Sequence, residues 1–174
     1  LVVKNKVVVG TTGGDSAHRG YVTAFDAETG RQAWRFWTIP GPGEKGHDTW
    51  AGDSWKSGGG SSWMTGSYDA ELNLVYWSIG NPAADFWGGN RKGDNLYTDS
   101  VVALDGDTGA LKWYYQQIPH DVWDFDTAYE NILFDAVVRG KPRKLLLNVN
   151  KGGVTWVLDR ATGEFVSGYP IVKH

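Results

Sequence analysis

The stretch Ala24-Phe25-Asp26-Ala27-Glu28-Thr29-Gly30, with Trp34 four residues later, has the form of a strand that enters a tight turn and returns. Asp26 can accept hydrogen bonds from backbone amides of the turn, and Gly30 can adopt the positive φ that closes it. Residues 21–26 and 31–37 supply the two strands on either side of this turn. We therefore predict a β-hairpin over residues 21–37.

The same unit recurs twice along the chain. Residues 103–109 (ALDGDTG) are followed by Trp113 at the same offset, whereas residues 157–163 (VLDRATG) have Ser167 at the tryptophan position. Repeats of one hairpin with a fixed tryptophan indicate the blades of an all-β protein, a β-propeller, in which each indole would wedge between neighbouring blades. Further strands are expected over residues 6–9, which we expect to be buried, 72–79 and 144–150.

Three hairpins cannot close a ring. We therefore expect residues 1–174 to be a segment of a single β-propeller domain, truncated at both ends. The composition agrees with a repetitive all-β fold, because 24 glycines provide many turns and 10 tryptophans provide large apolar plugs. A net charge of −3 without a basic run argues against a nucleic-acid partner. No apolar run has the length of a membrane span, and no cysteine is present to form a disulfide.

The polar stretch 119–126 (PHDVWDFD) combines three carboxylates, an imidazole and an indole. Alternation along an extended backbone would place Asp124 and Asp126 on one side, where their charges repel unless a cation lies between them. A bound metal ion is the simplest such cation, and a general base beside a metal is the second interpretation. Composition alone does not separate these from a polar loop. We predict His120 and Asp121 to be turn residues without a role in the site.

Other polar or aromatic residues lie near predicted strand ends, and alternate loops of a propeller meet at one face near its axis. Oxygen ligands from such loops suit a hard cation rather than zinc. Taken singly, each of these residues has a structural interpretation. Asp15 and Asn81 are typical of turns, Lys151 of a solvated turn, and Trp63 of a wedge between blades. The residues in question are Asp15, Trp63, Asn81, Asp124, Asp126 and Lys151.

With these motifs the chain resembles the pyrroloquinoline quinone (PQQ)-dependent alcohol dehydrogenases, the group that includes methanol dehydrogenase. The resemblance runs nearly from end to end and implies an eight-bladed propeller, of which this chain would supply roughly the middle three to four blades. The three hairpin repeats are similar to the tryptophan-docking motif of the family. The other matching stretches are residues 19–26, 58–63, 68–74, 80–82, 93–95, 119–124 and 158–160.

The resemblance implies roles for individual residues. Trp63 matches the tryptophan that lies flat under PQQ, and Lys151 matches the basic residue that contacts the reactive quinone oxygens. Thr12 and Ser61 match positions that hydrogen-bond the cofactor. Asp124 matches the base that takes the alcohol proton, and it is also an expected metal ligand.

For the metal, the resemblance implies ligands at Asp15, Asn81, Asp124 and Asp126. Asp15 stands where the family usually has a glutamate, so its shorter reach weakens the match. Calcium-dependent members have a small neutral residue two places after the base, whereas lanthanide-dependent members have an aspartate there. Asp126 therefore favours a lanthanide ion, with Ca²⁺ as the alternative, because a trivalent ion rewards one more carboxylate.

The function implied is oxidation of a small primary alcohol to an aldehyde by hydride transfer to metal-bound PQQ, with electrons passed to a cytochrome c. The periplasm is the expected compartment, a homodimer is a further possibility, and the 174 residues alone are not expected to be active. Two alternatives stay open: a non-catalytic propeller scaffold that shares the docking repeats, and a PQQ-dependent sugar or polyol dehydrogenase. The loop 38–57 and the pair Phe86 and Trp87 are candidates for substrate walls.

Overall fold

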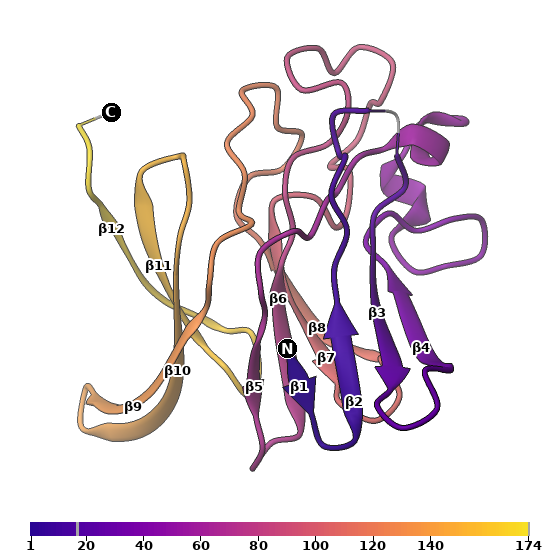
Figure 1. The fold of residues 1–174 in the computed structure, drawn as a ribbon. Helices are drawn as coiled ribbons and strands as arrows, with labels where there is room; N and C mark the ends of the chain where they lie inside the picture. Colours follow the sequence, from indigo (N-terminus) through magenta and orange to yellow (C-terminus); the bar gives the residue numbers. More distant parts are fainter. Residues whose placement is uncertain (17, 174) are drawn as a thin grey trace.

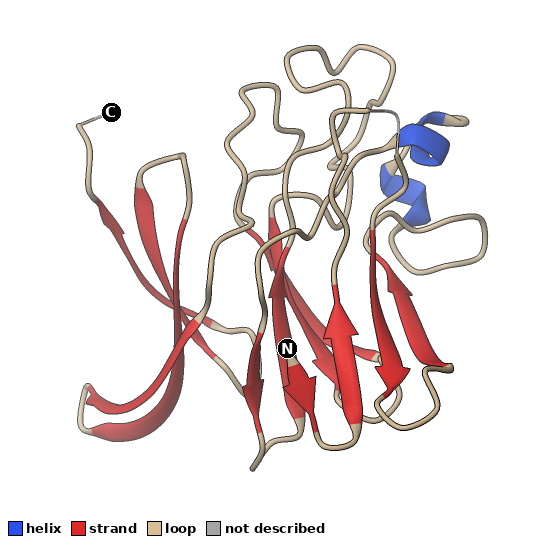
Figure 2. Ribbon diagram, viewed as in Figure 1, coloured by secondary structure: helices blue, strands red, loops and turns tan. Residues whose placement is uncertain are grey.

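The computed structural model describes residues 1–16 and 18–173. Three antiparallel four-stranded sheets, here named blades A, B and C, stand side by side like the blades of a fan (Figures 1 and 2). In each blade the strands follow one another in chain order. The strands are β1 (Val2–Val3), β2 (Lys6–Val9), β3 (Tyr21–Asp26) and β4 (Gln32–Trp37) in blade A; β5 (Ser67–Asp69), β6 (Leu74–Ser78), β7 (Ser100–Asp105) and β8 (Leu111–Gln116) in blade B; and β9 (Ile132–Val138), β10 (Lys141–Val149), β11 (Val154–Asp159) and β12 (Phe165–Pro170) in blade C.

The last two strands of every blade form the repeated hairpin, as the sequence predicts. In each copy the aspartate that begins the turn accepts hydrogen bonds from backbone amides two and three residues later, and the turn glycine has a positive φ. The register shifts by one residue at the same point in all three hairpins. The aspartate and glycine pairs are Asp26 and Gly30, Asp105 and Gly109, and Asp159 and Gly163.

Each docking tryptophan packs on the hairpin turn of the next blade. Trp34 of blade A lies over Gly109 of blade B, where an added Cβ would come within 2.5 Å of the indole. Trp113 of blade B lies over Gly163 of blade C, and an added Cβ would come within 2.8 Å. Ser167 occupies the equivalent place in blade C. The predicted wedge between blades is therefore confirmed for the two tryptophans.

The core consists of two apolar layers, one between blades A and B and one between blades B and C. Alternation along β6 sends Val75 and Trp77 into the first layer and Tyr76 into the second, so every residue of β6 is buried. Strand β2, in contrast to β6, is buried on one face only. Only Val8 of its four residues is fully buried, and the expectation of a buried strand is therefore wrong for its other face.

The hairpin turns occupy one end of the blades, and the longer loops occupy the opposite end (Figure 1). The long loop 38–60 is ordered by two short 3-10 helices, η1 (His47–Thr49) and η2 (Ser54–Ser57), and by the buried Trp50, whose Nε1 donates to the Leu96 carbonyl at 2.6 Å. Arg19 lies against this loop, with its guanidinium 5.0 Å from the ring of Trp55. Within the described residues, no helix is both long and apolar enough to cross a membrane.

Candidate active site

At the loop end of the blades, side chains from all three sheets surround a cavity of about 230 Å³. Five connections supply them: the segment after β2, the segment before β5, the segments after β6 and β10, and the β8–β9 connection. All eight residues that the sequence singled out line this one cavity, which also includes two glycines. The lining residues are Thr12, Gly13, Gly14, Asp15, Ser61, Trp63, Asn81, Asp124, Asp126 and Lys151.

Backbone hydrogen bonds between the loops fix their relative positions. The Ser62 amide donates to the Thr11 carbonyl at 2.8 Å, and the Gly80 amide donates to the Ser61 carbonyl at 2.8 Å. On the far side, the Lys151 amide donates to the Phe125 carbonyl at 3.0 Å. The site is thus built on backbone that the three blades hold in place.

Asp124 and Asp126 face the same cation, and that cation is the ammonium of Lys151. Its Nζ lies 3.0 Å from Asp124 Oδ2 and 2.5 Å from Asp126 Oδ2. The shared direction does not come from an extended backbone, as the sequence suggested, because Asp124 has φ 60° and Asp126 has φ 38°. Left-handed backbone conformations at both residues turn the two carboxylates inward. Lys151 is an exposed turn residue, as its sequence context suggests, but its ammonium lies in the cavity lining and contacts both acids.

Asp121 and His120 are not among the residues that line the cavity, and they shape the loop that carries the acids. The buried carboxylate of Asp121 accepts the amides of Trp123 at 2.8 Å and of Phe125 at 2.7 Å. His120 Nδ1 lies 2.7 Å from the Gly93 carbonyl oxygen. These contacts give the loop its left-handed turns, so Asp121 positions Asp124 without touching the cavity.

Burial determines the electrostatics of Asp126. Its side chain is nearly inaccessible, and burial raises its pKa even though Lys151 and the Asn81 amide, at 3.1 Å from Oδ1, both favour the charged form. Burial works against the charge of Lys151 too, but the carboxylates of Asp126 and Asp124 outweigh it and hold the pKa of Lys151 above its usual range. The ammonium is charged, and it does not fully neutralise its surroundings.

Asp85 is a residue that the sequence did not single out. Its Oδ1 accepts a hydrogen bond from Asn81 Nδ2 at 3.0 Å. Burial, followed by the charges of Asp15 and Asp124, raises the pKa of Asp85. An acid four residues after a predicted metal ligand, on the same loop, was the available signal. Asp15, Asp124 and Asp126 line the cavity and Asp85 lies beside it, whereas Lys151 is the one cation in the lining, so the site carries an excess of negative charge.

The donors fit a hard cation by their chemistry. Hard cations prefer carboxylate and amide oxygens as ligands, and a bound cation would offset the excess of negative charge in the cavity. Among residues 1–16 and 18–173, no three side chains of His, Cys, Asp or Glu form a metal cluster by themselves. A ligand set here would therefore need a further group such as the amide oxygen of Asn81, and Lys151 would share the two acids with the ion.

The part of the lining that Trp63 supplies suits a planar aromatic group. Trp63 is 45% exposed and lies over Gly80, where an added Cβ would come within 2.6 Å of its ring. It is thus an open floor of the cavity and not a wedge between blades. The buried hydroxyl of Ser61 has no partner among the described residues, and an added Cβ at Gly14 would come within 2.5 Å of it. A flat face and an unused hydroxyl are features that a polar quinone would employ.

Comparison with known proteins identifies the family of the chain. The family model "PQQ: Glucose/ethanol/alcohol dehydrogenase, beta-propeller domain" matches residues 1–173. A quinohemoprotein alcohol dehydrogenase, ADH-IIG, of Pseudomonas putida is 46% identical over 98% of this chain and 26% of its own length. A lanthanide-dependent methanol dehydrogenase of Methylorubrum extorquens is 42% identical over 94% of this chain and 30% of its own.

Solved structures agree as well. The chain is similar to the structure of ADH-IIG from Pseudomonas putida HK5 with a TM-score of 0.94 and 45% identity, over 99% of this chain and 27% of that one. A europium-containing methanol dehydrogenase gives a TM-score of 0.93 and 38% identity, over 99% of this chain and 33% of that one. The chain belongs to the family of PQQ-dependent alcohol dehydrogenases and forms part of a β-propeller. It spans about a quarter to a third of these relatives.

Proposed function

We propose that the intact protein oxidises a small primary alcohol to an aldehyde with PQQ and a metal ion bound at this cavity. The observation that carries the proposal is the meeting of eight predicted residues from three blades around one cavity with surplus negative charge. The relatives, which include alcohol and methanol dehydrogenases, support the reaction class.

In this proposal each residue has a defined task, and Asp124 has two. Trp63 is the stacking floor, while Thr12 and Ser61 hydrogen-bond the cofactor edge. Asp124, half-buried and facing the cavity, accepts the hydroxyl proton of the alcohol. Lys151 holds its positive charge beside the position where negative charge develops on the cofactor. When bound, PQQ supplies the hydride acceptor, and the metal ion polarises the reacting carbonyl.

Asp15, Asn81, Asp124 and Asp126 are the proposed metal ligands. We favour a lanthanide over Ca²⁺, because Asp126 adds one more buried carboxylate to the proposed ligand set. A trivalent cation gains more from that carboxylate than a divalent one. Asp126→Ala should therefore abolish lanthanide-supported activity. Wild-type activity with calcium alone would overturn the choice of metal.

Three further features of the proposal come from the family resemblance. Electrons pass to a cytochrome c, the compartment is the periplasm, and a homodimer is the proposed assembly. The alternatives are a PQQ-dependent sugar or polyol dehydrogenase and a non-catalytic propeller scaffold. Phe86 and Trp87, exposed on the loop after β6 and outside the cavity lining, would help to distinguish alcohols from larger polyols.

The test is Asp124→Asn in the intact protein, reconstituted with PQQ and lanthanum or calcium and assayed with a dye-linked alcohol assay. Loss of the base should lower turnover by about 10²–10⁴-fold while the absorption of bound PQQ persists. Asp53→Asn, in an exposed ion pair with Lys56, is the control and should retain turnover. Near-normal turnover of Asp124→Asn would contradict the proposed base, and turnover with polyols alone would favour the sugar enzyme.

A further inference from the structure

The side-chain amide of Asn81 is held through its nitrogen. Nδ2 donates to Asp85 Oδ1 at 3.0 Å and to the Pro82 carbonyl at 3.3 Å, and it lies 3.5 Å from Asp15 Oδ1. Among the described residues, none donates to the amide oxygen of Asn81, although the residue is 2% exposed and lines the cavity. The nitrogen is thus anchored on the side of Asp85, while the oxygen is free to face the cavity.

The hydrogen-bonding chemistry of the carboxylate determines the orientation of the Asn81 amide. The two ends of an amide are nearly equal in size, so rotation by half a turn exchanges a donor for an acceptor with little steric cost. An ionised carboxylate only accepts hydrogen bonds, and it repels an amide oxygen placed beside it. A carboxylate at 3.0 Å therefore holds the nitrogen toward itself and turns the oxygen of Asn81 the other way.

Of the three acceptors, Asp85 is the one suited to this task. Asp15 lies farther away and lines the cavity, where its own oxygens are proposed to face the metal. The Pro82 carbonyl is a neutral acceptor, and its hydrogen bond to Asn81 is longer than that of Asp85. Asp85 is half-buried behind Asn81, outside the cavity lining, on the same loop.

The backbone that carries Asp85 is fixed from the interior. Arg91 is fully buried, and its Nη2 donates to the Ala84 carbonyl at 2.8 Å and to the Asp121 carbonyl at 2.6 Å. One guanidinium thus joins the loop of Asp85 to the loop of Asp124 and Asp126. Asp85 has a defined position before any ligand is present, as a positioning residue needs.

We propose that Asp85 is a positioning residue for the metal: it fixes the orientation of the Asn81 amide so that the amide oxygen, and not the nitrogen, faces the cation. The inference rests on the proposed metal site. Removal of the acceptor would leave the amide free to turn, and a water molecule would then replace the Asn81 oxygen on the ion. Residues behind metal ligands typically change metal affinity by about 10–100-fold when mutated.

The experiment uses europium luminescence in the intact protein without PQQ. Titration gives the Eu³⁺ affinity, and lifetimes in H₂O and D₂O give the number of water molecules on the ion. Asp85→Ala should weaken Eu³⁺ binding by about 10–100-fold and add one water to the ion. Asp85→Asn retains an acceptor oxygen, so it should weaken binding less and leave the water count unchanged.

Asp94→Ala, which removes an exposed carboxylate from the same loop, is the charge control and should behave as wild type. Wild-type affinity and water count in Asp85→Ala would overturn the inference while the metal proposal stands. An equal change in Asp85→Ala and Asp85→Asn would overturn it too, since charge alone would then explain the effect. Failure of the wild-type protein to bind Eu³⁺ would overturn the proposed metal site itself.

Discussion

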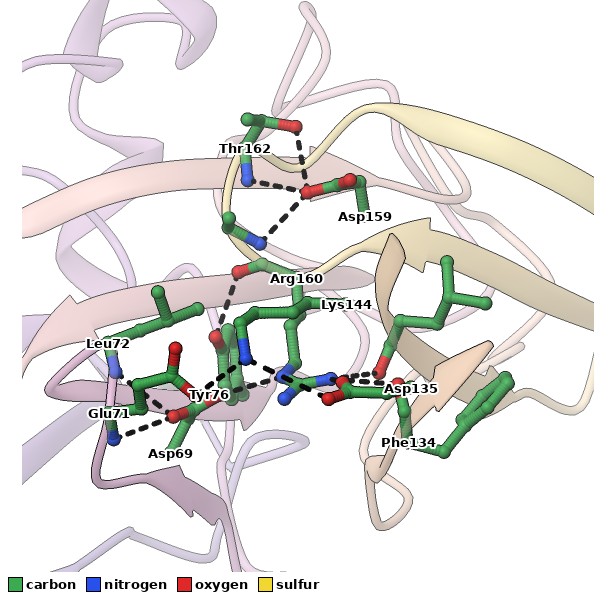
Figure 3. A network of polar contacts seen from close by, with 12 residues as sticks. Asp69, Glu71, Leu72, Tyr76, Phe134, Asp135, Lys144, Asp159, Arg160 and Thr162 are labelled. Atoms are coloured by element: carbon green, nitrogen blue, oxygen red, sulfur yellow. Dashed lines mark hydrogen bonds and ion pairs between the residues drawn. The ribbon is translucent and has the colours of Figure 1, made fainter. Parts of the chain in front are cut away.

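Two clusters of acids and bases, one between blades B and C and one at the cavity, contain similar residues and behave in opposite ways. In the first, buried Arg160 donates through Nε to Asp69 Oδ2 at 2.7 Å and through Nη1 to Asp135, and its carbonyl accepts the Tyr76 hydroxyl at 2.8 Å (Figure 3). Lys144 adds a second cation, 2.7 Å from Glu71. The acids of this cluster are thus nearly balanced by the positive charges of Arg160 and Lys144 within the fold.

The pKa values of one aspartate in each cluster show the difference. Burial would raise the pKa of Asp69, but the Leu72 amide and Arg160 outweigh it, so that the pKa lies below its ordinary value. Burial raises the pKa of Asp126, and Lys151 does not compensate for it. The first cluster stabilises the fold, whereas the second has charge left over for a ligand. The two clusters differ in how many cationic and amide donors face their carboxylates, and not in the kinds of residue that they contain.

Loss of the cation from the balanced cluster should have the largest effect on stability. Arg160→Met leaves Asp69 buried without its charged partner, and we expect a loss of about 3–5 kcal/mol in the free energy of unfolding. Arg143→Met is the control, because its pair with Glu164 at 2.8 Å lies at the surface and should contribute little to stability. Denaturant unfolding measures both. Equal losses would show that the buried cluster is no stronger than a surface pair.

The hairpin turn beside Arg160 provides a second test of the interface between blades. Gly163→Ala places a Cβ within 2.8 Å of Trp113 at φ 79°, whereas Gly30→Ala meets nothing within 4 Å at φ 69°. The left-handed strain of roughly 1–2 kcal/mol is common to both. The clash with the indole should add about 1–3 kcal/mol for Gly163→Ala alone. Similar thermal stabilities of the two variants would mean that tryptophan docking contributes little.

The pH dependence of the metal-free protein should have opposite signs at the two aspartates. The lowered pKa of Asp69 gives stability that is present above the pKa of the unfolded carboxyl, ordinarily 3.8, and is lost as the pH falls through the folded value. The raised pKa of Asp126 destabilises the fold at neutral pH, and this penalty disappears as the pH falls below its folded value.

Asn substitutions measure these signs directly. At pH 7, Asp69→Asn should lower the free energy of unfolding, whereas Asp126→Asn should raise it slightly in metal-free protein. The Asp126 difference should shrink as the pH falls toward 4, whereas the Asp69 difference should persist to that pH and shrink only below 3.8. Urea titrations at several pH values check this, and destabilisation by Asp126→Asn at pH 7 would show that its charge is already fully compensated by Lys151.

Local signals made much of the fold predictable. The turn chemistry of Asp26 and Gly30 depends on residues within one hairpin, and the spacing to Trp34 repeats in the next copy, so both could be read from the sequence. The half-exposed face of β2 could not, because burial depends on which blade faces it. The eight cavity residues were predicted to lie together mainly from the resemblance to a known family and less from composition.

The details of the site were less accessible. The left-handed backbone at Asp124 and Asp126 accompanies hydrogen bonds from the Trp123 and Phe125 amides to the Asp121 carboxylate. The alternation of side chains along an extended strand does not capture these contacts within the loop. The placement of Lys151 between the acids requires two loops from neighbouring blades to meet. Asp85 was missed because its position four residues after Asn81 gains significance only once the hydrogen bond between the two side chains is known.

The central claim is that the cavity, unlike the Arg160 cluster, has carboxylate charge that only an added cation can neutralise. Calorimetric titration of the metal-free intact protein with La³⁺ tests it most directly, with Asp126→Asn and Asp135→Asn as the matched pair from the two clusters. We predict one La³⁺ per chain in the wild type, binding weakened at least about tenfold by Asp126→Asn, and wild-type binding in Asp135→Asn. No binding in the wild type, or equal weakening in both variants, would contradict the account.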